Sequence, residues 1–215
     1  MSDVKRSIAT RVAGHLHPGE VVNLGIGIPT LVADRLRPSD GVVLETENGL
    51  LGVGPAPAEA AIDPMLINAG KLPVTAMPGA SYFSSSVSFG LIRGGHVTTA
   101  VLGALQADAA GRIANWAVPG KPILGVGGAM DLLVGARRVI VATTHTSRSG
   151  EPKIVAACTY PLTADRPVDL IVTEAATFAV VDGHLELVEI ARGITRRWVE
   201  DHTNAPFIDR TESRP

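Results

Sequence analysis

Short continuous apolar runs, each about as long as one β-strand, most constrain the fold that this chain can adopt. They lie at residues 21–24, 42–44, 97–102, 138–143, 154–159 and 170–173. A strand that is apolar along its length has both faces buried, which is typical of a parallel sheet covered by helices. Helical patterns between the runs supply that cover. The sequence therefore predicts an α/β fold with an open, mostly parallel sheet and helices on both faces.

Helix signals separate these runs. Apolar residues recur at i+4 spacing from Val4 to Leu16 after Ser2, a residue type that favours N-caps, and Pro18 follows. This pattern predicts a first amphipathic helix that stops before Pro18. Further helices are expected at residues 30–36, 129–136 and 195–201.

A tight turn near the end of the chain predicts an antiparallel element. Asp182-Gly183 separates apolar runs at residues 178–181 and 185–190, a strong signal for a hairpin. We therefore expect the sheet to be mixed. The sequence has no internal repeat and no change in composition, so residues 1–215 are predicted to form a single domain.

Residues 52–80 are rich in turn formers and contain five prolines. A loop region of this length in a compact domain is more often a binding surface than an idle connection. We therefore expect this segment to take part in recognition.

The charge balance excludes several classes of protein. Lys and Arg number 19 and Asp and Glu 21, with a net charge of −2 and no basic block, which is unlike a nucleic-acid binder. No apolar stretch approaches the roughly 18 residues of a membrane span. A single cysteine allows no internal disulfide and suits a reducing compartment. Since the first twenty residues lack an apolar signal core, a cytoplasmic protein is expected.

The common nucleophile and metal patterns are missing. The six histidines show no metal-ligand spacing, so no metal site is predicted. Cys158 lies in an apolar run and is interpreted as a small core residue within a strand. The serine run at residues 84–86 lacks the nucleophile-elbow pattern of serine hydrolases.

A glycine turn follows the first apolar run. Gly25 and Gly27 come between that run and the helix expected from Thr30. A dinucleotide-binding fingerprint would need a third glycine where Thr30 stands. Two other interpretations remain open at this point: a tight strand-to-helix turn, or an anion site in which backbone N–H groups around Asn23, Gly25 and Gly27 face a negative charge.

Two carboxylates close the second apolar run. Glu45 and Glu47 are spaced to lie on the same side of a strand, and Glu47 directly precedes the Asn48-Gly49 turn. The carboxyl end of an inner strand is where open α/β sheets place their ligands. Glu47 is therefore a candidate catalytic residue; the alternative is an acidic residue at the start of a hairpin.

A second glycine-rich turn precedes the helix expected at residues 129–136. It contains Gly125, Gly127 and Gly128, and Lys121 lies just upstream. These residues suit a second anion site with a nearby cation, although a flexible turn with a solvated lysine fits equally well.

These stretches together resemble the B subunit (β chain) of the family I, 3-oxoacid type CoA-transferases, from about residue 10 to about residue 207. The order and spacing of the whole set carry the resemblance, since each motif alone is weak. The matching segments are Asn23-Leu24-Gly25-Ile26-Gly27, Pro29-Thr30, Glu47-Asn48-Gly49-Leu50-Leu51-Gly52-Val53-Gly54-Pro55, Leu66-Ile67-Asn68-Ala69-Gly70-Lys71, Ser88-Phe89, Ile92-Arg93-Gly94-Gly95-His96, Leu102-Gly103-Ala104, Ala114-Asn115-Trp116, Pro119-Gly120-Lys121, Gly127-Gly128-Ala129-Met130-Asp131-Leu132 and Pro161-Leu162-Thr163.

The resemblance implies CoA transfer between an acyl-CoA and a free carboxylic acid, in a fold shared with sugar-phosphate isomerases and deaminases. Glu47 aligns with the family's catalytic glutamate, which forms a mixed anhydride and then a glutamyl-CoA thioester. By similarity, the backbone N–H groups of Asn23 and Gly128 stabilise the oxyanion. The nearby Gly25, Gly27 and Gly127 are expected in oxyanion or CoA binding, and Lys121 in a contact with CoA.

The family also implies the partners. We expect a separate CoA-transferase α chain, similar in fold, in an αβ or α2β2 assembly with the active site between the two chains. The expected substrates are succinyl-CoA and either acetoacetate or 3-oxoadipate. Coenzyme A is then a substrate, and no cofactor is predicted.

Two residues depart from the family pattern. Thr46 stands where a serine usually precedes the glutamate, and Thr144 stands where an acidic residue commonly precedes the histidine at 145. The second departure weakens any transfer of substrate specificity. Two alternatives stay open: a sugar-phosphate isomerase or deaminase that uses Glu47 as a general base, and a partner chain without catalytic function.

Overall fold

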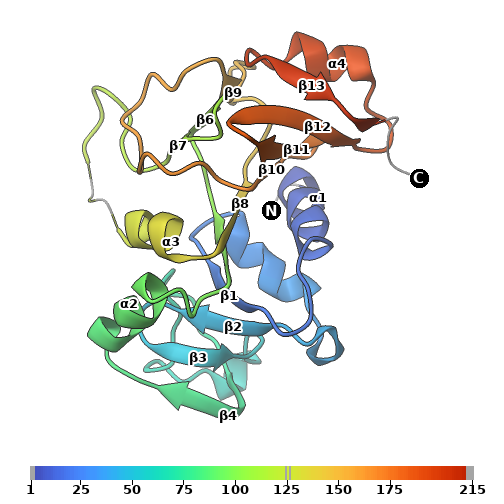
Figure 1. The fold of residues 1–215 in the computed structure, drawn as a ribbon. Helices are drawn as coiled ribbons and strands as arrows, with labels where there is room; N and C mark the ends of the chain where they lie inside the picture. The colour runs from blue at the N-terminus through green and yellow to red at the C-terminus, as the bar shows by residue number, and fades with distance from the viewer. Residues whose placement is uncertain (1–2, 124, 126, 212–215) are drawn as a thin grey trace.

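Strands and helices alternate along the chain in a computed structural model that describes residues 3–123, 125 and 127–211 (Figure 1). The strands are β1 (Val21–Leu24), β2 (Val43–Thr46), β3 (Leu50–Val53), β4 (Ala76–Tyr82), β5 (Thr99–Leu102), β6 (Gln106–Asp108), β7 (Ile113–Ala114), β8 (Arg138–Ala142), β9 (Ile154–Val155), β10 (Leu170–Val172), β11 (Ala176–Val181), β12 (His184–Ile190) and β13 (Phe207–Asp209).

Four α-helices and three 3-10 helices connect the strands in the described part of the chain. The α-helices are α1 (Asp3–Ala13), α2 (Ser85–Arg93), α3 (Ala129–Gly135) and α4 (Arg196–Asp201), and the 3-10 helices are η1 (Pro29–Arg35), η2 (Pro38–Asp40) and η3 (Glu59–Ala61). The first helix ends before Leu16, earlier than predicted, and the helix expected at residues 30–36 has the tighter 3-10 form. Helix α2 was not predicted.

One ten-stranded sheet organises the chain in the order β13-β12-β11-β10-β8-β5-β1-β2-β3-β4. Its central strands β10, β8, β5, β1 and β2 run parallel to one another. The hairpins β2–β3–β4 and β10–β11–β12 add antiparallel pairs on either side. The prediction of a mostly parallel, mixed sheet is therefore confirmed.

Helices cover both faces of this sheet. Val101 and Leu102 are consecutive on β5, so their side chains point to opposite faces. Val101 belongs to the core cluster that contains Ile8 of α1 and Val22 of β1. Leu102 belongs to the larger cluster that contains Leu132 of α3. Strand β5 is thus buried on both sides, which explains its continuous apolar sequence.

The predicted hairpin at Asp182-Gly183 is confirmed. Strands β11 and β12 pair antiparallel up to Val181 and His184. Asp182 and Gly183 have φ of 48° and 77°, the positive values that a two-residue hairpin turn of type I′ requires.

The strand expected at residues 154–159 is much shorter, and the placement of Cys158 within it is wrong. Strand β9 ends at Val155 and belongs to a separate small sheet ordered β7-β6-β9. Cys158 lies beyond it, half-buried, with Sγ 3.7 Å from the carbonyl oxygen of Arg112. Burial raises the pKa of the Cys158 thiol to about 11, so the thiol is protonated near neutral pH and unsuited to be a nucleophile.

Residues 52–80 include more regular structure than predicted. The segment begins in β3, passes through η3 and ends in β4, which is an edge of the large sheet. Pro78 lies within β4, at an edge where a strand can do without one backbone donor.

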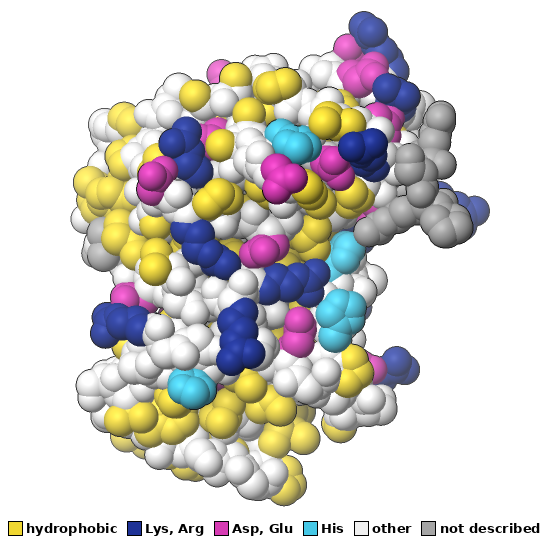
Figure 2. All heavy atoms as spheres, viewed as in Figure 1, with side chains coloured by type: hydrophobic (Ala, Val, Ile, Leu, Met, Phe, Trp, Pro, Cys, Tyr) yellow, Lys and Arg dark blue, Asp and Glu magenta, His cyan; other side chains and the backbone are white. Residues whose placement is uncertain are grey.

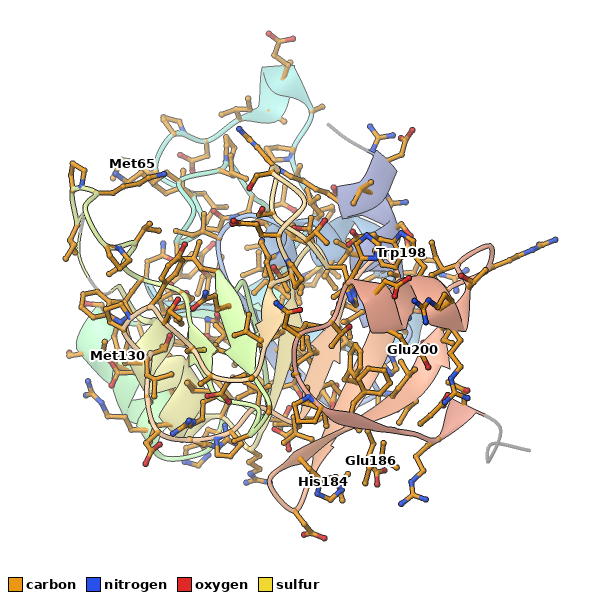
Figure 3. The ribbon with its side chains drawn as sticks, turned by 90° about the horizontal axis from the view of Figure 1, so that it is seen from above. Met65, Met130, His184, Glu186, Trp198 and Glu200 are labelled. Atoms are coloured by element: carbon orange, nitrogen blue, oxygen red, sulfur yellow. The ribbon has the colours of Figure 1, made fainter. Side chains whose placement is uncertain are left out.

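A buried histidine lies just after β8. His145 has no exposed surface, and its Nδ1 and Nε2 each lie 3.0 Å from a hydroxyl oxygen, that of Thr173 and that of Thr203. The Trp198 ring of α4 packs edge-on against it at a centroid distance of 5.2 Å. Figure 3 shows Trp198 on the opposite side of the molecule from Met130 of α3. His145 is therefore a core residue of the α4 side.

Stability should fall as this histidine is forced to take up a proton. Burial, assisted by the charge of His202, lowers the pKa of His145 to about 4. As the pH falls from 6.5 towards 4, the unfolded chain binds the proton first, which favours unfolding. We expect His145 to remove about 2 kcal/mol from the free energy of unfolding between pH 7 and pH 5. Urea titrations of wild type and His145→Gln at both pH values measure this difference.

His184→Gln, at a partly exposed histidine, is the control for the general effect of removing an imidazole. An equal loss between pH 7 and pH 5 in wild type and His145→Gln would contradict the prediction.

Candidate active site

The carboxyl ends of β1 and β2 lie at the same edge of the sheet, because these neighbouring strands run parallel with Asn23 opposite Glu45. The Gly25–Gly27 turn follows β1, and Glu47 follows β2. This edge is where open α/β sheets bind their ligands, so the chain brings two of its predicted site segments to one place.

A tight turn presents Glu47. The Gly49 N–H donates a hydrogen bond of 2.9 Å to the Thr46 carbonyl oxygen, which closes the turn between β2 and β3. Gly49 has a φ of 118°, and an added Cβ would overlap the carbonyl group of Phe83, 3.1 Å from its carbon atom. Only glycine fits both the conformation and the space. Glu47 thus lies at the start of a hairpin and is also presented to solvent at the strand end.

Hydrogen bonds on both sides of Glu47 connect this turn to residues 52–80, the proline-rich segment. The hydroxyl oxygen of Thr46 accepts a hydrogen bond from the Ala69 N–H at 2.9 Å. The Asn48 side chain donates to the carbonyl oxygen of Ile67 at 2.8 Å. The backbone on either side of the candidate catalytic residue is therefore held by residues 67–69.

One buried amide joins the two carboxylates. The Nδ2 group of Asn23 donates to Glu45 Oε2 at 2.8 Å and to Glu47 Oε2 at 3.0 Å. Asn23 has no exposed surface, and Glu45 is 4% exposed, whereas Glu47 is partly exposed. Of the two carboxylates, Glu47 is therefore the one that a substrate can reach.

Glu45 is held from its other oxygen as well. The Ser88 hydroxyl of α2 donates to Glu45 Oε1 at 2.6 Å. Burial raises the pKa of Glu45, the hydrogen bonds from Asn23 and Ser88 oppose that rise, and the neighbouring charge of Glu47 adds to it. The sequence places Ser88 in a family-like segment but indicates no role for it, because nothing local shows that its helix brings it to the buried Glu45.

A cleft of about 560 Å³ gathers most of the predicted site. Glu47, Gly25, Lys121, Gly127 and Gly128 all line it. A Cβ added to Gly128 would lie 3.6 Å from Glu47 Cγ and 3.2 Å from the Phe89 ring. The two glycine turns, about 100 residues apart in the sequence, thus meet at Glu47.

The backbone N–H groups of Gly25 and Gly27 in the first turn are already engaged. Gly25 donates to the Val101 carbonyl oxygen at 2.8 Å, and Gly27 donates to the Thr30 hydroxyl at 3.1 Å. Asn23 lies within β1, which is paired on both sides. Its side-chain amide, rather than its backbone N–H, is the donor that reaches Glu47. Gly25 and Gly27 shape the turn that leads the chain away from the end of β1.

Hydrogen bonds also fix the wall of the cleft. Asn115 donates to the Gly103 carbonyl oxygen at 3.2 Å and accepts from the Thr163 hydroxyl at 2.8 Å. Trp116 Nε1 donates to the Leu162 carbonyl oxygen at 3.1 Å. Asn115, Trp116 and Gly103 all line the cleft, so these distant segments form one rigid surface facing Glu47.

The described residues hold neither a metal cluster nor a membrane span. No group of three or more His, Cys, Asp or Glu residues among them is placed to hold a metal ion. No helix in the described part of the chain is long and apolar enough to cross a bilayer.

Thr144, which departs from the family pattern, lies outside the cleft. Its hydroxyl donates to the Thr146 carbonyl oxygen at 2.7 Å, and Thr144 does not line the cleft.

Known proteins resemble this chain over nearly its whole length. Residues 5–210 match the family described as Coenzyme A transferase. The beta subunit of acetate CoA-transferase from Escherichia coli strain K12 is 48% identical over 205 residues, which cover 95% of this chain and 94% of that protein. The B subunit of the probable succinyl-CoA:3-ketoacid coenzyme A transferase from Bacillus subtilis strain 168 is 44% identical over 207 residues, or 96% of each protein.

A solved structure shares the fold. The acyl-CoA transferase apoenzyme of Escherichia coli O157:H7 superposes with a TM-score of 0.76 at 22% sequence identity. The match covers 98% of this chain but 42% of that longer one, so this chain spans about two fifths of its length.

The turn that presents Glu47 should tolerate no side chain at Gly49. We expect Gly49→Ala to lower the free energy of unfolding by about 2–4 kcal/mol, because it adds both backbone strain and a clash with Phe83. Urea titration measures the loss. Gly90→Ala is the matched control, since its Cβ meets open space in α2 and alanine favours helices. Equal stability of the two variants would contradict this account of the turn.

Proposed function

The chain belongs to the coenzyme A transferase family, and we propose that it is the B subunit (β chain) of a CoA-transferase. The proposed reaction moves CoA from an acyl-CoA, such as succinyl-CoA, to a 3-oxo acid, acetoacetate or 3-oxoadipate. The observation that carries the proposal is the placement of Glu47. This carboxylate opens into a cleft of about 560 Å³ where two glycine turns meet, and it accepts a hydrogen bond from the buried Asn23.

Glu47 acts as the nucleophile in the proposed first half of the reaction. A Glu47 oxygen attacks the thioester carbonyl of the acyl-CoA, the C–S bond breaks, and CoA leaves as a thiolate. The product is a mixed anhydride of Glu47. The thiolate then attacks the Glu47 carbonyl carbon, releases the acid as its carboxylate, and leaves a glutamyl-CoA thioester.

The second half runs the same steps in reverse with the 3-oxo acid. Its carboxylate attacks the Glu47 thioester and displaces the CoA thiolate, which forms a new mixed anhydride. The thiolate then attacks the acyl carbonyl, which gives the new acyl-CoA and restores the Glu47 carboxylate. Atoms and charge balance, so the reaction needs no cofactor, and CoA is itself a substrate.

Each attack develops an oxyanion that needs a donor. The Asn23 Nδ2 group lies 3.0 Å from Glu47 Oε2, which makes it the proposed donor for the Glu47 carbonyl. Gly128 precedes α3 and lies against Glu47, so a backbone N–H there is the proposed second donor. A side chain at Gly128 would fill the space beside Phe89 and the nucleophile. Lys121 lines the same cleft and is the proposed cation for the CoA phosphates.

We propose that a separate α chain completes the enzyme. The proline-rich segment exposes large apolar side chains, with Met65 88%, Leu72 53% and Ile62 45% exposed. On the face that Figure 2 shows, hydrophobic side chains also gather over the region of β2–β4. Exposed apolar groups of this kind mark interaction surfaces. The relatives named as subunits, and the longer solved chain of which this one spans 42%, support the same conclusion.

Trapping the intermediate tests the nucleophile. Acyl-CoA is added to the complex of this protein with its α chain, borohydride reduces any thioester, and mass spectrometry locates the reduced residue. We expect reduction at Glu47 and a loss of kcat of at least about 10⁴-fold in Glu47→Ala, because among the described residues that line the cleft only Glu47 carries a carboxylate. Glu151→Ala, at an exposed glutamate, is the control for general effects of losing a carboxylate.

Other outcomes would support the alternatives. CoA transfer with an unmodified Glu47 would overturn the thioester mechanism. A Glu47-dependent isomerase or deaminase activity on sugar phosphates, without CoA transfer, would favour a general base. Normal transfer by a complex that contains Glu47→Ala would make this chain a non-catalytic partner.

Competition between acids tests the proposed acceptor. With succinyl-CoA as donor, we expect a higher kcat/KM for acetoacetate or 3-oxoadipate than for acetate. A preference for acetate would instead match the activity named for the Escherichia coli relative. Formation of each acyl-CoA, followed by chromatography, measures the preference.

A further inference from the structure

Glu45 has no part in the proposed chemistry, yet it is built into the site. Its Oε2 accepts from Asn23 at 2.8 Å, its Oε1 accepts from Ser88 at 2.6 Å, and only 4% of its surface is exposed. A carboxyl group buried on an inner strand is costly unless its partners hold it. Glu45 lines a separate cavity of about 400 Å³ and not the Glu47 cleft, so contact with a substrate in that cleft does not explain its presence.

The amide of Asn23 is held from its amino side. Both N–H bonds of Nδ2 are used, one by Glu45 and one by Glu47. Its Oδ1 is buried and has no hydrogen-bond partner among the described residues. Because Oδ1 makes no such bond, the orientation of the Asn23 amide is set by the two carboxyl groups that accept from Nδ2.

Glu47 cannot fix the amide through a whole reaction cycle. If the proposed function holds, Glu47 becomes an anhydride and then a thioester, and both forms are weaker acceptors than a carboxylate. Rotating the amide by half a turn would then place Oδ1 beside Glu47 and leave the oxyanion without its donor. Glu45, buried and unreactive, keeps its acceptor oxygen on Asn23 at every step.

We propose that Glu45 is a positioning residue that keeps the amino group of Asn23 directed at Glu47 while Glu47 carries its acyl and CoA groups. The inference rests on the proposed function, because it matters only if Glu47 is converted during turnover. In the same proposal, Ser88 on α2 holds the second oxygen of Glu45 by its hydrogen bond. The required property is an acceptor oxygen towards Asn23, whether or not the Glu45 carboxyl is charged.

Two variants separate this acceptor role from the charge. Glu45→Gln keeps an oxygen for Asn23 and places an amide N–H where it can donate to the Ser88 hydroxyl. Glu45→Leu has a similar size and removes the acceptor. In the complex with the α chain, we expect Glu45→Leu to lower kcat by about 10²-fold, the order typical of losing one oxyanion donor, with the KM for acyl-CoA little changed. Glu45→Gln should restore kcat to within about 5-fold of wild type, because positioning is kept.

Thr99→Val controls for loss of a buried hydrogen bond in the same sheet. The Thr99 hydroxyl donates to Glu20 Oε1 at 3.0 Å, and Thr99 has no exposed surface. This variant should keep the wild-type kcat. Thermal unfolding of every complex identifies variants that are folded at the assay temperature, and burst-phase formation of the glutamyl-CoA thioester gives a second readout in each.

The outcomes decide the inference separately from the proposed function. Glu45→Leu with wild-type kcat and burst rate would overturn the positioning role. So would an equal kcat loss in folded Glu45→Leu and Glu45→Gln, since both would then reflect charge. Failure of the wild-type complex to form any Glu47 adduct would instead overturn the proposed function. If Glu45→Leu does not fold, Ser88→Ala in a Glu45→Gln background, which should be slower than Glu45→Gln alone, provides the decisive comparison.

Discussion

The site depends on one buried amide that bridges two carboxylates, one on the neighbouring strand and one in the turn that follows it. Asn23 reaches both Glu45 and Glu47 because β1 and β2 run parallel with Asn23 opposite Glu45. A one-residue slip between these strands would turn the side chains to the other face and break both bonds. The apolar side chains that bury β1, such as Val22, therefore also set the geometry of the candidate active site.

The parallel core of the sheet and the presentation of Glu47 at a strand end could both be predicted from the sequence. Apolar runs long enough for one strand predict buried strands, and a carboxylate followed by Asn48-Gly49 predicts a polar group presented at a strand end. Both rest on local signals. The meeting of Gly25 with Gly128 is a property of the sheet order and became an expectation only through the family resemblance.

Other parts of the site depend on contacts that no local pattern records. Helix α2 begins at a serine-rich stretch that suits a loop as well as a cap, so neither the helix nor the role of its buried Ser88 was predicted. The Gly25 N–H was a candidate anion donor, but pairing with Val101 extends beyond β1 and uses it. The run that contains Cys158 is apolar, yet only Ile154 and Val155 find a strand to pair with. Tertiary pairing decides each of these cases.

The two hydrogen bonds that flank Glu47 connect the proline-rich segment to the candidate active site. The Ala69 N–H is bonded to the Thr46 hydroxyl, and the Ile67 carbonyl oxygen to the Asn48 side chain, one on each side of the proposed nucleophile. Met65 and Leu72, with their exposed apolar side chains, lie within four residues of these attachment points along the chain. A partner that binds this surface would therefore contact a segment that two hydrogen bonds join to the backbone on either side of Glu47.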